Sequence, residues 1–443
     1  MVKKMQELLE EKNFLELRKL LESMNSADIP SLFEELEEDQ MIIIYRLLSK
    51  DMAAEVFVEL DSDMQEKLIN ALTDKELKSV IDEIFMDDMV DLIEEMPANV
   101  VKRILKTKDA AERKIINKLL KYPEDSAGSI MTTEFVDLKE NMTAEDAINK
   151  IRKIAEDVES IDTCYVLTMT RKLIGTVGLK EIILAKPKTI VKDIMDTNFI
   201  KVLALEDQEE VVKKFDKYDE VSLPVVDKEN RLVGIVTVDD AMDVMKEEVK
   251  EDFEIMAAIT PSEDSYFKTS VFKHARNRIF WLLILMLSAA VTGGVITRYE
   301  NAFATLPLLV AFLPMVMGTG GNCGSQSSTL IIRGLANDEI KTKDVFKAWW
   351  KEVRVAFLVG LALFAVNFLR VLFQYHDTKL GIIIGTTLMG TVTIAKSLGC
   401  ILPIIAKKLK MDPAIMAAPL ISTILDTCSV LLYFNIATLV MGL

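Results

Sequence analysis

An acidic residue lies deep inside a long apolar stretch near the C-terminus. Asp426 is the one carboxylate between residues 413 and 443, and an ionised carboxylate at bilayer depth costs roughly 2.5 to 3.5 kcal/mol even on lenient insertion scales. We therefore expect Asp426 to face a water-filled interior; an ion pair with Lys396 is the alternative. Helical spacing places Thr423 on the same face as Asp426, and Pro419, seven residues earlier, predicts a kink.

A second unusual segment lies within the uncharged stretch 301–332. Pro314 removes a backbone donor, and four glycines follow between residues 318 and 324, a composition that weakens a helix. Irregular backbone at membrane depth is tolerated only where protein or water satisfies its polar groups, so we expect this segment to line a hydrated path. Close helix packing through small residues is the alternative. The candidate path residues here are Pro314, Gly321, Asn322, Gly324 and Gln326.

These oxygen-bearing side chains suit a small, hard dication better than a soft metal. Magnesium sheds its water reluctantly, so one or two carboxylates and polar groups around a hydrated ion would fit it. One aspartate per chain is too little for a dry cage, whereas two chains about a two-fold axis supply two. We therefore expect a homodimer. The four cysteines and two histidines form no cluster along the sequence that suits a soft metal or a disulfide framework.

Five charge-poor stretches predict five membrane-spanning helices, since about 20 apolar residues cross a bilayer. Basic residues cluster before the first stretch, between the second and third, and between the fourth and fifth. The positive-inside rule then places these segments and the N-terminus in the cytosol and the C-terminus on the opposite side of a lipid bilayer. The stretches are 279–297, 301–332, 355–374, 380–405 and 413–443.

The first 267 residues have a different character. They contain 61 Asp and Glu against 36 Lys and Arg, a net charge of −25, whereas the remainder has 8 against 17, a net charge of +9. An acidic, water-soluble half is thus joined to a basic, apolar half. A chain of pI about 4.9 lacks the basic stripe that neutralises phosphates, so we expect no nucleic-acid partner.

Two regions of the acidic half differ in pattern. Residues 1–126 carry apolar residues at helical spacing in short segments and predict an all-α array of stacked helices. Residues 127–187 and 188–245 resemble each other, as LIGTVGLKEII from Leu173 and LVGIVTVDDAM from Leu232 show. Each copy predicts the order strand, helix, strand, strand, helix, so this region is expected to be α+β.

The repeat resembles a tandem pair of CBS domains, a regulatory module that often binds adenine nucleotides such as ATP. In such modules a Thr or Ser three residues before an Asp commonly holds the ribose. The second copy has Thr237 and Asp240 in this arrangement, and the first has Gly178 and Glu181. A nucleotide site and a plain helix N-cap at Thr237 both fit this pattern.

A helix dense in carboxylates is expected to connect the repeat to the apolar half. The connecting segment covers residues 246–270, and its helix is expected to begin near residue 239. Acidic residues recur there at spacings of three and four, so like charges repel along the helix. A solvated face is one interpretation, and ordering by divalent cations is the other. The carboxylates concerned are Asp240, Asp243, Glu248, Glu251 and Asp252.

In this order, the parts of the chain resemble the MgtE family of magnesium channels. The most specific motifs are GTGGNCGSQSSTLIIRGLA from Gly318 and DPAIMAAPLISTILD from Asp412. The resemblance implies a multidomain protein with an all-α N-domain, an α+β CBS pair (127–245) and an α-helical five-span transmembrane domain (271–443). It also implies a homodimer with a pore between the subunits, in which Asp426 binds hydrated Mg²⁺ and Asp412 lies near the cytosolic mouth.

The resemblance further implies that cytosolic Mg²⁺ closes the pore. The ion would bridge carboxylates of the N-domain, the CBS pair and the acidic helix, which acts as a plug. By position, the bridging residues are the plug carboxylates named above together with Asp87, Asp88, Asp91, Glu209 and Asp219.

Two other functions are kept as alternatives. A membrane-anchored CBS nucleotide sensor would use the spans only as an anchor, and it would not need Asp426 inside one. A divalent-cation transporter that also accepts Mn²⁺ or Co²⁺ would use the same path. An enzyme is not indicated, because the sequence contains no GxSxG, P-loop or HExxH pattern.

Overall fold

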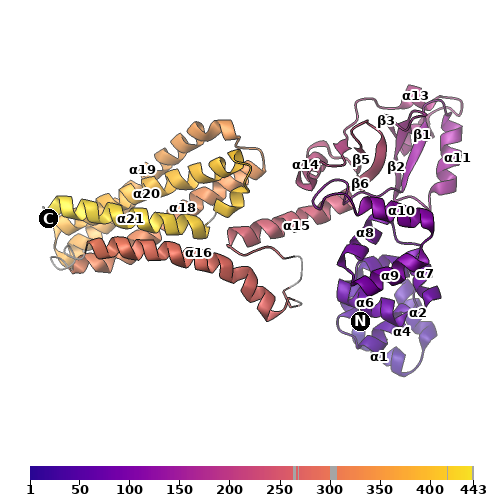
Figure 1. The fold of residues 1–443 in the computed structure, drawn as a ribbon, viewed down its shortest axis with the longest axis horizontal. Coiled ribbons are helices and arrows are strands. Elements are labelled where there is room, and N and C mark those ends of the chain that lie inside the picture. Colours follow the sequence, from indigo (N-terminus) through magenta and orange to yellow (C-terminus); the bar gives the residue numbers. More distant parts are fainter. Residues whose placement is uncertain (263–265, 268, 300–306, 417, 442–443) are drawn as a thin grey trace. The chain divides into compact units, whose positions relative to one another are not determined.

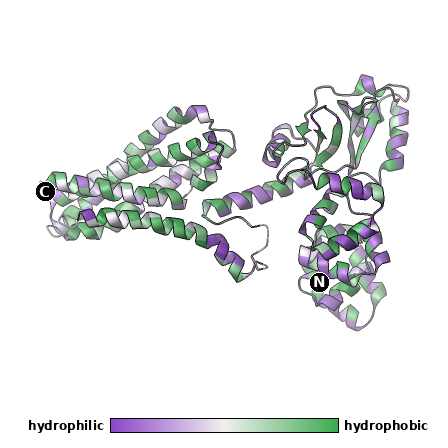
Figure 2. Ribbon diagram, viewed as in Figure 1, coloured by the Kyte–Doolittle hydropathy of each residue, from purple (hydrophilic) through white to green (hydrophobic). Residues whose placement is uncertain are grey.

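The computed structural model describes residues 1–262, 266–267, 269–299, 307–416 and 418–441. Its contacts divide the chain into two compact units, Met1–Met245 and Lys246–Leu443, and each is described by itself (Figure 1). The helices of the first unit alternate polar and apolar residues, whereas the five long helices of the second are mostly apolar along their length (Figure 2).

The fully described segment 2–119 forms ten α-helices. They are α1 (Val2–Glu10), α2 (Phe14–Glu22), α3 (Ile29–Phe33), α4 (Glu38–Tyr45), α5 (Lys50–Val58), α6 (Ser62–Ala71), α7 (Asp74–Ile81), α8 (Met86–Glu95), α9 (Ala98–Thr107) and α10 (Ala110–Leu119), with the 3₁₀ helix η1 (Ser26–Asp28) before α3. Reciprocal capping boxes define two of the starts, Thr73 with Glu76 at α7 and Asp109 with Glu112 at α10. The apolar stripes of these helices face inward and form one core.

The repeat forms two three-stranded sheets. Its elements are β1 (Phe135–Lys139), α11 (Ala144–Ile154), β2 (Ser160–Leu167), β3 (Leu173–Gly178), α12 (Leu179–Leu184), α13 (Val191–Ile194), β4 (Val202–Leu203), α14 (Gln208–Tyr218), β5 (Ser222–Val226) and β6 (Leu232–Thr237). In each sheet the first strand pairs parallel with the second, which pairs antiparallel with the third. The Tyr165 and Ser222 hydroxyls, 2.7 Å apart, join the two sheets. The predicted tandem α+β pair is confirmed.

The helical N-terminal region packs against the second sheet. Ile104 and Leu119 belong to the same buried cluster as Val202, Phe215 and Val225. Beside this core, the Met86 amide at the start of α8 donates a hydrogen bond to the Glu134 carboxylate at 2.9 Å. Helix α15 (Val238–Met256) follows β6 directly. The first turns of α8 and α15 are therefore parts of one compact unit.

Five helices of the described residues are long and apolar enough to cross a membrane. They are α16 (Val271–Arg298), α18 (Leu308–Ala336), α19 (Val345–Tyr375), α20 (Thr378–Lys408) and α21 (Ala418–Met441), with the 3₁₀ helices η2 (Thr342–Asp344) and η3 (Pro413–Met416) before α19 and α21. The five-helix layout is confirmed. The third helix begins at Val345 rather than at residue 355, because a charged helical segment precedes the apolar stretch 355–374.

The glycine-rich helix is not broken. Helix α18 runs without interruption from Leu308 to Ala336, through Pro314 and all four glycines, which corrects the expected irregular backbone. In an apolar medium no water competes for the helical hydrogen bonds, so glycine weakens a helix less there.

Three of these glycines instead permit close helix packing. A Cβ atom on Gly324 would lie 2.2 Å from the Leu425 side chain, and one on Gly321 would lie 3.1 Å from the Ser422 hydroxyl. Gly320 faces Ser429 in the same way. Helices α18 and α21 therefore approach closely along this side, as the small-residue alternative predicted.

A testable consequence concerns the crossing of α18 and α20. A Cβ atom on Gly399 would lie 2.5 Å from the backbone oxygen of Gly324, and a backbone atom cannot rotate away. We expect Gly399→Ala to destabilise the full-length protein in detergent by about 1 to 3 kcal/mol, because overpacking forces backbone shifts. The measurement is the midpoint of thermal unfolding followed by circular dichroism.

The matched control is Gly293→Ala on α16, where a Cβ atom would meet nothing within 4 Å. This control should leave the midpoint unchanged or raise it slightly. Equal midpoints for the two variants would contradict the close crossing.

Candidate functional site

Asp426 lies within α21, and its side chain is partly exposed in the single chain. The hydroxyl of Thr423, one turn earlier, donates a hydrogen bond to the Leu420 carbonyl at 2.9 Å. Thr427, the next residue, meets the Thr292 hydroxyl of α16 at 2.6 Å. Within the described residues, no cationic side chain lies at ion-pair distance from the Asp426 carboxylate. A carboxylate held at bilayer depth without a countercharge can attract a mobile cation.

The alternative partner of Asp426 is engaged elsewhere. The Lys396 ammonium lies 3.5 Å from Glu352 Oε2 on α19 and 3.2 Å from Ser327 Oγ on α18, so the Asp426–Lys396 ion pair considered above is wrong. Glu352 is thus a second carboxylate inside a membrane helix. It lies just before the apolar stretch 355–374, so it was not predicted as part of the third span. The available signal was Lys396 itself, since a buried cation needs an anion nearby.

Helix α18 leaves one polar face uncovered in the single chain. Pro314, Gly318, Asn322 and Gln326 follow one another at intervals of four residues, and all four are exposed. This spacing keeps them on one side of the helix. Of the predicted path residues, Pro314, Asn322 and Gln326 share this uncovered face, whereas Gly321 and Gly324 are buried against α21.

The start of the fifth span is fixed by local hydrogen bonds. The Asp412 carboxylate accepts one from the Ala414 amide at 2.8 Å, as a cap of η3. The Ser328 hydroxyl of α18 donates to the Met416 carbonyl at 2.6 Å. Pro419 is the second residue of α21, where a proline begins a helix rather than kinking it, so the expected kink at this position is wrong.

A group of carboxylates gathers where α8 meets the start of α15. Asp87 and Asp88 lie in the first turn of α8, and Asp239 and Asp240 lie in the first turn of α15. Burial raises the pKa of Asp87 well above its ordinary value, and the charges of Asp240 and Asp88 raise it further. Burial, with the charges of Asp240 and Asp239, also raises the pKa of Asp88 to about 7.

Two neighbours of these residues were not predicted from the sequence. Burial and the charges of Asp240 and Asp239 raise the pKa of Glu159 to about 8. Burial also raises the pKa of Glu134, against two hydrogen bonds that lower it. Glu134 has no acidic neighbour in the sequence, and Glu159 ends the short acidic run that begins at Glu156. Nothing in the sequence places either residue beside α15, so only the folded arrangement reveals them. The acidic junction is defined here as Asp87, Asp88, Glu134, Glu159, Asp239 and Asp240.

The acidic junction is a region of like charge rather than a formed coordination sphere. Burial raises the pKa of Asp240 to about 6, although a hydrogen bond from Thr237 opposes the shift. Among the described residues, no three His, Cys, Asp or Glu side chains converge closely enough to hold one metal ion. The junction can therefore attract a hydrated dication without surrounding it.

The remaining predicted regulatory residues are placed outside the acidic junction. Glu209 forms an ion pair with Lys213 at 3.0 Å on α14, and Asp219 ends that helix in a left-handed conformation with φ 55°. Asp91 lies later in α8. Asp243, Glu248, Glu251 and Asp252 continue along α15.

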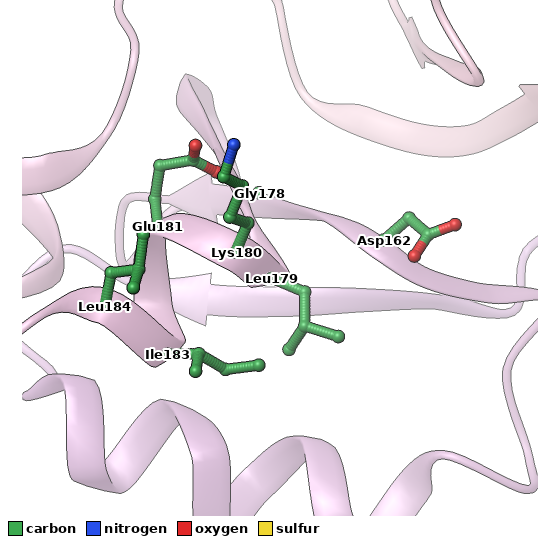
Figure 3. Close-up of a pocket in the computed structure, with 7 residues that line it drawn as sticks. All are labelled: Asp162, Gly178, Leu179, Lys180, Glu181, Ile183 and Leu184. Atoms are coloured by element: carbon green, nitrogen blue, oxygen red, sulfur yellow. The ribbon is translucent and has the colours of Figure 1, made fainter.

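Thr237 and Asp240 cap α15. The Asp240 carboxylate accepts hydrogen bonds from the backbone amide and the hydroxyl of Thr237, which is the carboxylate half of a capping box. A nucleotide site and a plain N-cap at Thr237 both stay predictions. The corresponding place in the first copy is an open hollow of about 510 Å³. Glu181 lies beside Gly178 there, with Lys180 next to it (Figure 3).

Sequence profiles of known families match most of the chain. The MgtE intracellular N domain matches residues 24–125, the CBS domain matches 127–188 and 191–247, and the MgtE divalent cation transporter domain matches 313–436.

Two solved structures resemble the cytosolic part. One is the cytosolic domain of the Mg²⁺ channel MgtE in complex with ATP, with 36% identity, a TM-score of 0.53, and coverage of 55% of this chain and 100% of that chain. The other is the soluble part of a magnesium transporter, with 28% identity, a TM-score of 0.52, and coverage of 56% of this chain and 97% of that chain.

Full-length relatives extend the similarity into the membrane helices. The chain is 37% identical over 352 residues to the magnesium transporter MgtE of Bacillus subtilis (strain 168), covering 80% of this chain and 78% of that protein. It is 35% identical over 360 residues to the magnesium transporter MgtE of Thermus thermophilus, covering 80% of each. The chain therefore belongs to the MgtE family of divalent cation transporters, as a multi-pass membrane protein with a CBS-containing soluble region.

Proposed function

We propose that this protein is a magnesium channel that conducts hydrated Mg²⁺ between two copies of the chain and is closed by cytosolic Mg²⁺. The observation that carries the proposal is the uncovered polar face of α18 at bilayer depth. Asn322 and Gln326 are exposed on that face in the single chain. Amide groups facing lipid would lose their hydrogen bonds to water at a cost of several kcal/mol. Water and a second copy, rather than lipid, are therefore the occupants that fit.

The charge of the path favours a hydrated dication. Asp426 has no countercharge among the described residues. In a two-fold dimer with the path on its axis, the two copies of Asp426 would bring two carboxylates to that axis. Two carboxylates balance one Mg²⁺, and the amides of Asn322 and Gln326 can bind its water shell. A path of this kind also admits Mn²⁺ or Co²⁺ to some degree, and the flux experiment below includes both ions.

The direction of closure follows from the topology. With five spans and basic segments beside α16, α19 and α21, the positive-inside rule places the soluble unit in the cytosol and the C-terminus on the opposite side. The acidic junction then meets cytosolic Mg²⁺. Without a cation the crowded carboxylates of α8 and α15 repel each other, and a bound dication favours the docked arrangement.

An adenine nucleotide is a second proposed ligand of the soluble unit. A relative's cytosolic domain with 36% identity to this chain was solved in complex with ATP. In this chain the candidate is the Thr237–Asp240 pair at the start of α15. Because Asp240 also belongs to the acidic junction, nucleotide and Mg²⁺ would act on the same helix start.

The pore assignment predicts that Asp426→Asn lowers Mg²⁺ flux into liposomes by about tenfold or more. The reason is that a charge-assisted contact is worth about 1.5 to 3 kcal/mol, and 1.4 kcal/mol corresponds to a factor of ten. Flux of Mg²⁺, Mn²⁺, Co²⁺ and Ca²⁺ is compared with an ion-sensitive dye. Asp338→Asn, an exposed acidic position after α18, is the control and should conduct normally. Wild-type flux through Asp426→Asn would refute the assignment.

The gating assignment predicts that Asp88→Asn raises the Mg²⁺ concentration that halves the flux by about fivefold or more, the lower end of typical coupling between sites. The loss of one junction carboxylate weakens the bridged, closed state and leaves the path itself intact. Glu145→Gln, an exposed position on α11, is the control. Unchanged inhibition in the Asp88 variant would place the sensor outside the acidic junction.

The raised pKa values predict how stability depends on pH. Asp88, Glu159 and Asp240 have folded pKa values of about 7, 8 and 6, raised from 3.8, 4.5 and 3.8. The folded state therefore binds these protons more tightly than the unfolded state. Their contribution to stability is fully present below the unfolded values and is lost as the pH rises through the folded ones.

Without divalent cations, the thermal midpoint of the full-length protein should fall between pH 6 and pH 8. Millimolar Mg²⁺ should restore the midpoint at pH 8 and change it little at pH 5.5, where protons already occupy the carboxylates. Glu159→Gln should flatten the pH profile, whereas Glu145→Gln should not. A profile of Glu159→Gln identical to that of the wild type would contradict the assignment.

A further inference from the structure

Three polar side chains from three membrane helices meet in the interior of the second unit. The Ser327 hydroxyl of α18 donates to Glu352 Oε2 of α19 at 2.5 Å, and the Lys396 ammonium of α20 donates to Ser327 Oγ at 3.2 Å. The two charges lie 3.5 Å apart. The residues are 0%, 9% and 4% exposed, respectively. One hydroxyl thus bridges a buried ion pair, using its one donor and one of its two acceptor positions.

The bridge requires the backbone contact between α18 and α20. A Cβ atom on Gly399 would lie 3.1 Å from Ser327 Cβ and 2.5 Å from the Gly324 oxygen. Lys396 precedes Gly399 by one turn and faces the same neighbour. Any side chain at Gly399 would separate the two helices and lengthen the Lys396–Ser327 contact.

Neighbouring residues of α18 point in three directions at this level. Gln326 lies on the uncovered polar face, Ser327 holds the buried ion pair, and Ser328 donates to the Met416 carbonyl beside the start of α21. A rotation of α18 by one residue, about 100°, would move Ser327 away from both charges and turn Gln326 into the protein.

A buried ion pair is a poor source of stability, because its desolvation offsets most of its attraction and apolar replacements are often neutral. In some proteins such a pair fixes register instead, since the wrong register leaves a buried charge unpaired. An apolar layer in the same place would tolerate a slide or a turn of α18.

We propose that Glu352 and Lys396 are positioning residues for ion permeation. Through Ser327 they fix the rotation and register of α18, so that Asn322 and Gln326 face the ion path. This inference rests on the proposed function for its effect on selectivity, whereas its effect on the orientation of α18 is independent of it.

The decisive variant is E352M/K396M, which removes both charges at similar volume, tested in the full-length protein. We expect its thermal midpoint in detergent to stay within a few degrees of the wild type. We expect its Mg²⁺ over Ca²⁺ flux ratio in liposomes to fall by about fivefold or more, because a turned α18 withdraws the amides of Asn322 and Gln326 from the water shell of the ion, and one lost hydrogen bond changes affinity by up to about tenfold. The charge-swapped variant E352K/K396E restores the pair and should recover part of the ratio.

A labelling experiment measures the register without ion flux. In a chain whose four cysteines are replaced by alanine, Q326C should react readily with a water-soluble maleimide. Adding E352M/K396M should slow that reaction several-fold, whereas adding the control substitution D338N should not.

Two results would overturn the proposal: a wild-type flux ratio in E352M/K396M, or unchanged labelling of Q326C in that background. If the double variant does not fold, S327A replaces it as the test, because it removes only the bridging hydroxyl and keeps both charges. A lowered flux ratio in S327A supports the proposal, and a wild-type ratio refutes it. If the wild-type protein carries no Mg²⁺, the proposed function fails, and the labelling comparison alone confirms or refutes the positioning role.

Discussion

The cost of placing charge where water is scarce governs both units of this protein. In the membrane helices, the carboxylates of Glu352 and Asp426 meet this cost in different ways. Glu352 and Lys396 compensate each other within one chain, 3.5 Å apart, and are fixed parts of the fold. Asp426 has no such partner among the described residues. A carboxylate in that position is tolerated only if something mobile supplies the opposite charge, which makes it suitable for an ion in transit.

The same constraint acts in the soluble unit, with protons and cations as competitors. Folding brings the starts of α8 and α15 together, so carboxylates that are separate in the unfolded chain repel each other in the folded one. The folded unit can relieve this repulsion by taking up protons, by binding a dication, or by separating the two helices. All three responses lower the same electrostatic repulsion, so the proposed gate would respond to pH as well as to Mg²⁺.

Much of the architecture could be predicted from the sequence, because it depends on patterns within single segments. Hydropathy predicts the five membrane helices, and internal similarity predicts the paired sheets. The sequence also identifies Asp426, since a lone carboxylate in an apolar stretch is conspicuous. Glu352, Glu134 and Glu159 were missed for the opposite reason. None of them stands alone in a long apolar stretch, and only tertiary contacts bury them.

The glycine-rich segment of α18 shows why composition alone misled. Glycines and a proline indicate a weak helix in water, where the solvent competes for backbone hydrogen bonds. Among other membrane helices the same residues bring backbones into contact, and the helix is continuous.

The close backbone contact between α18 and its neighbours gives the polar side chains on its two sides different roles. On the buried side, close approach brings Ser327 and Ser328 within hydrogen-bond distance of α19, α20 and η3. In the positioning role proposed above, these bonds keep the helix from turning Asn322 and Gln326 away from the uncovered face. The polar groups available to an ion thus depend on the polar groups that never meet it.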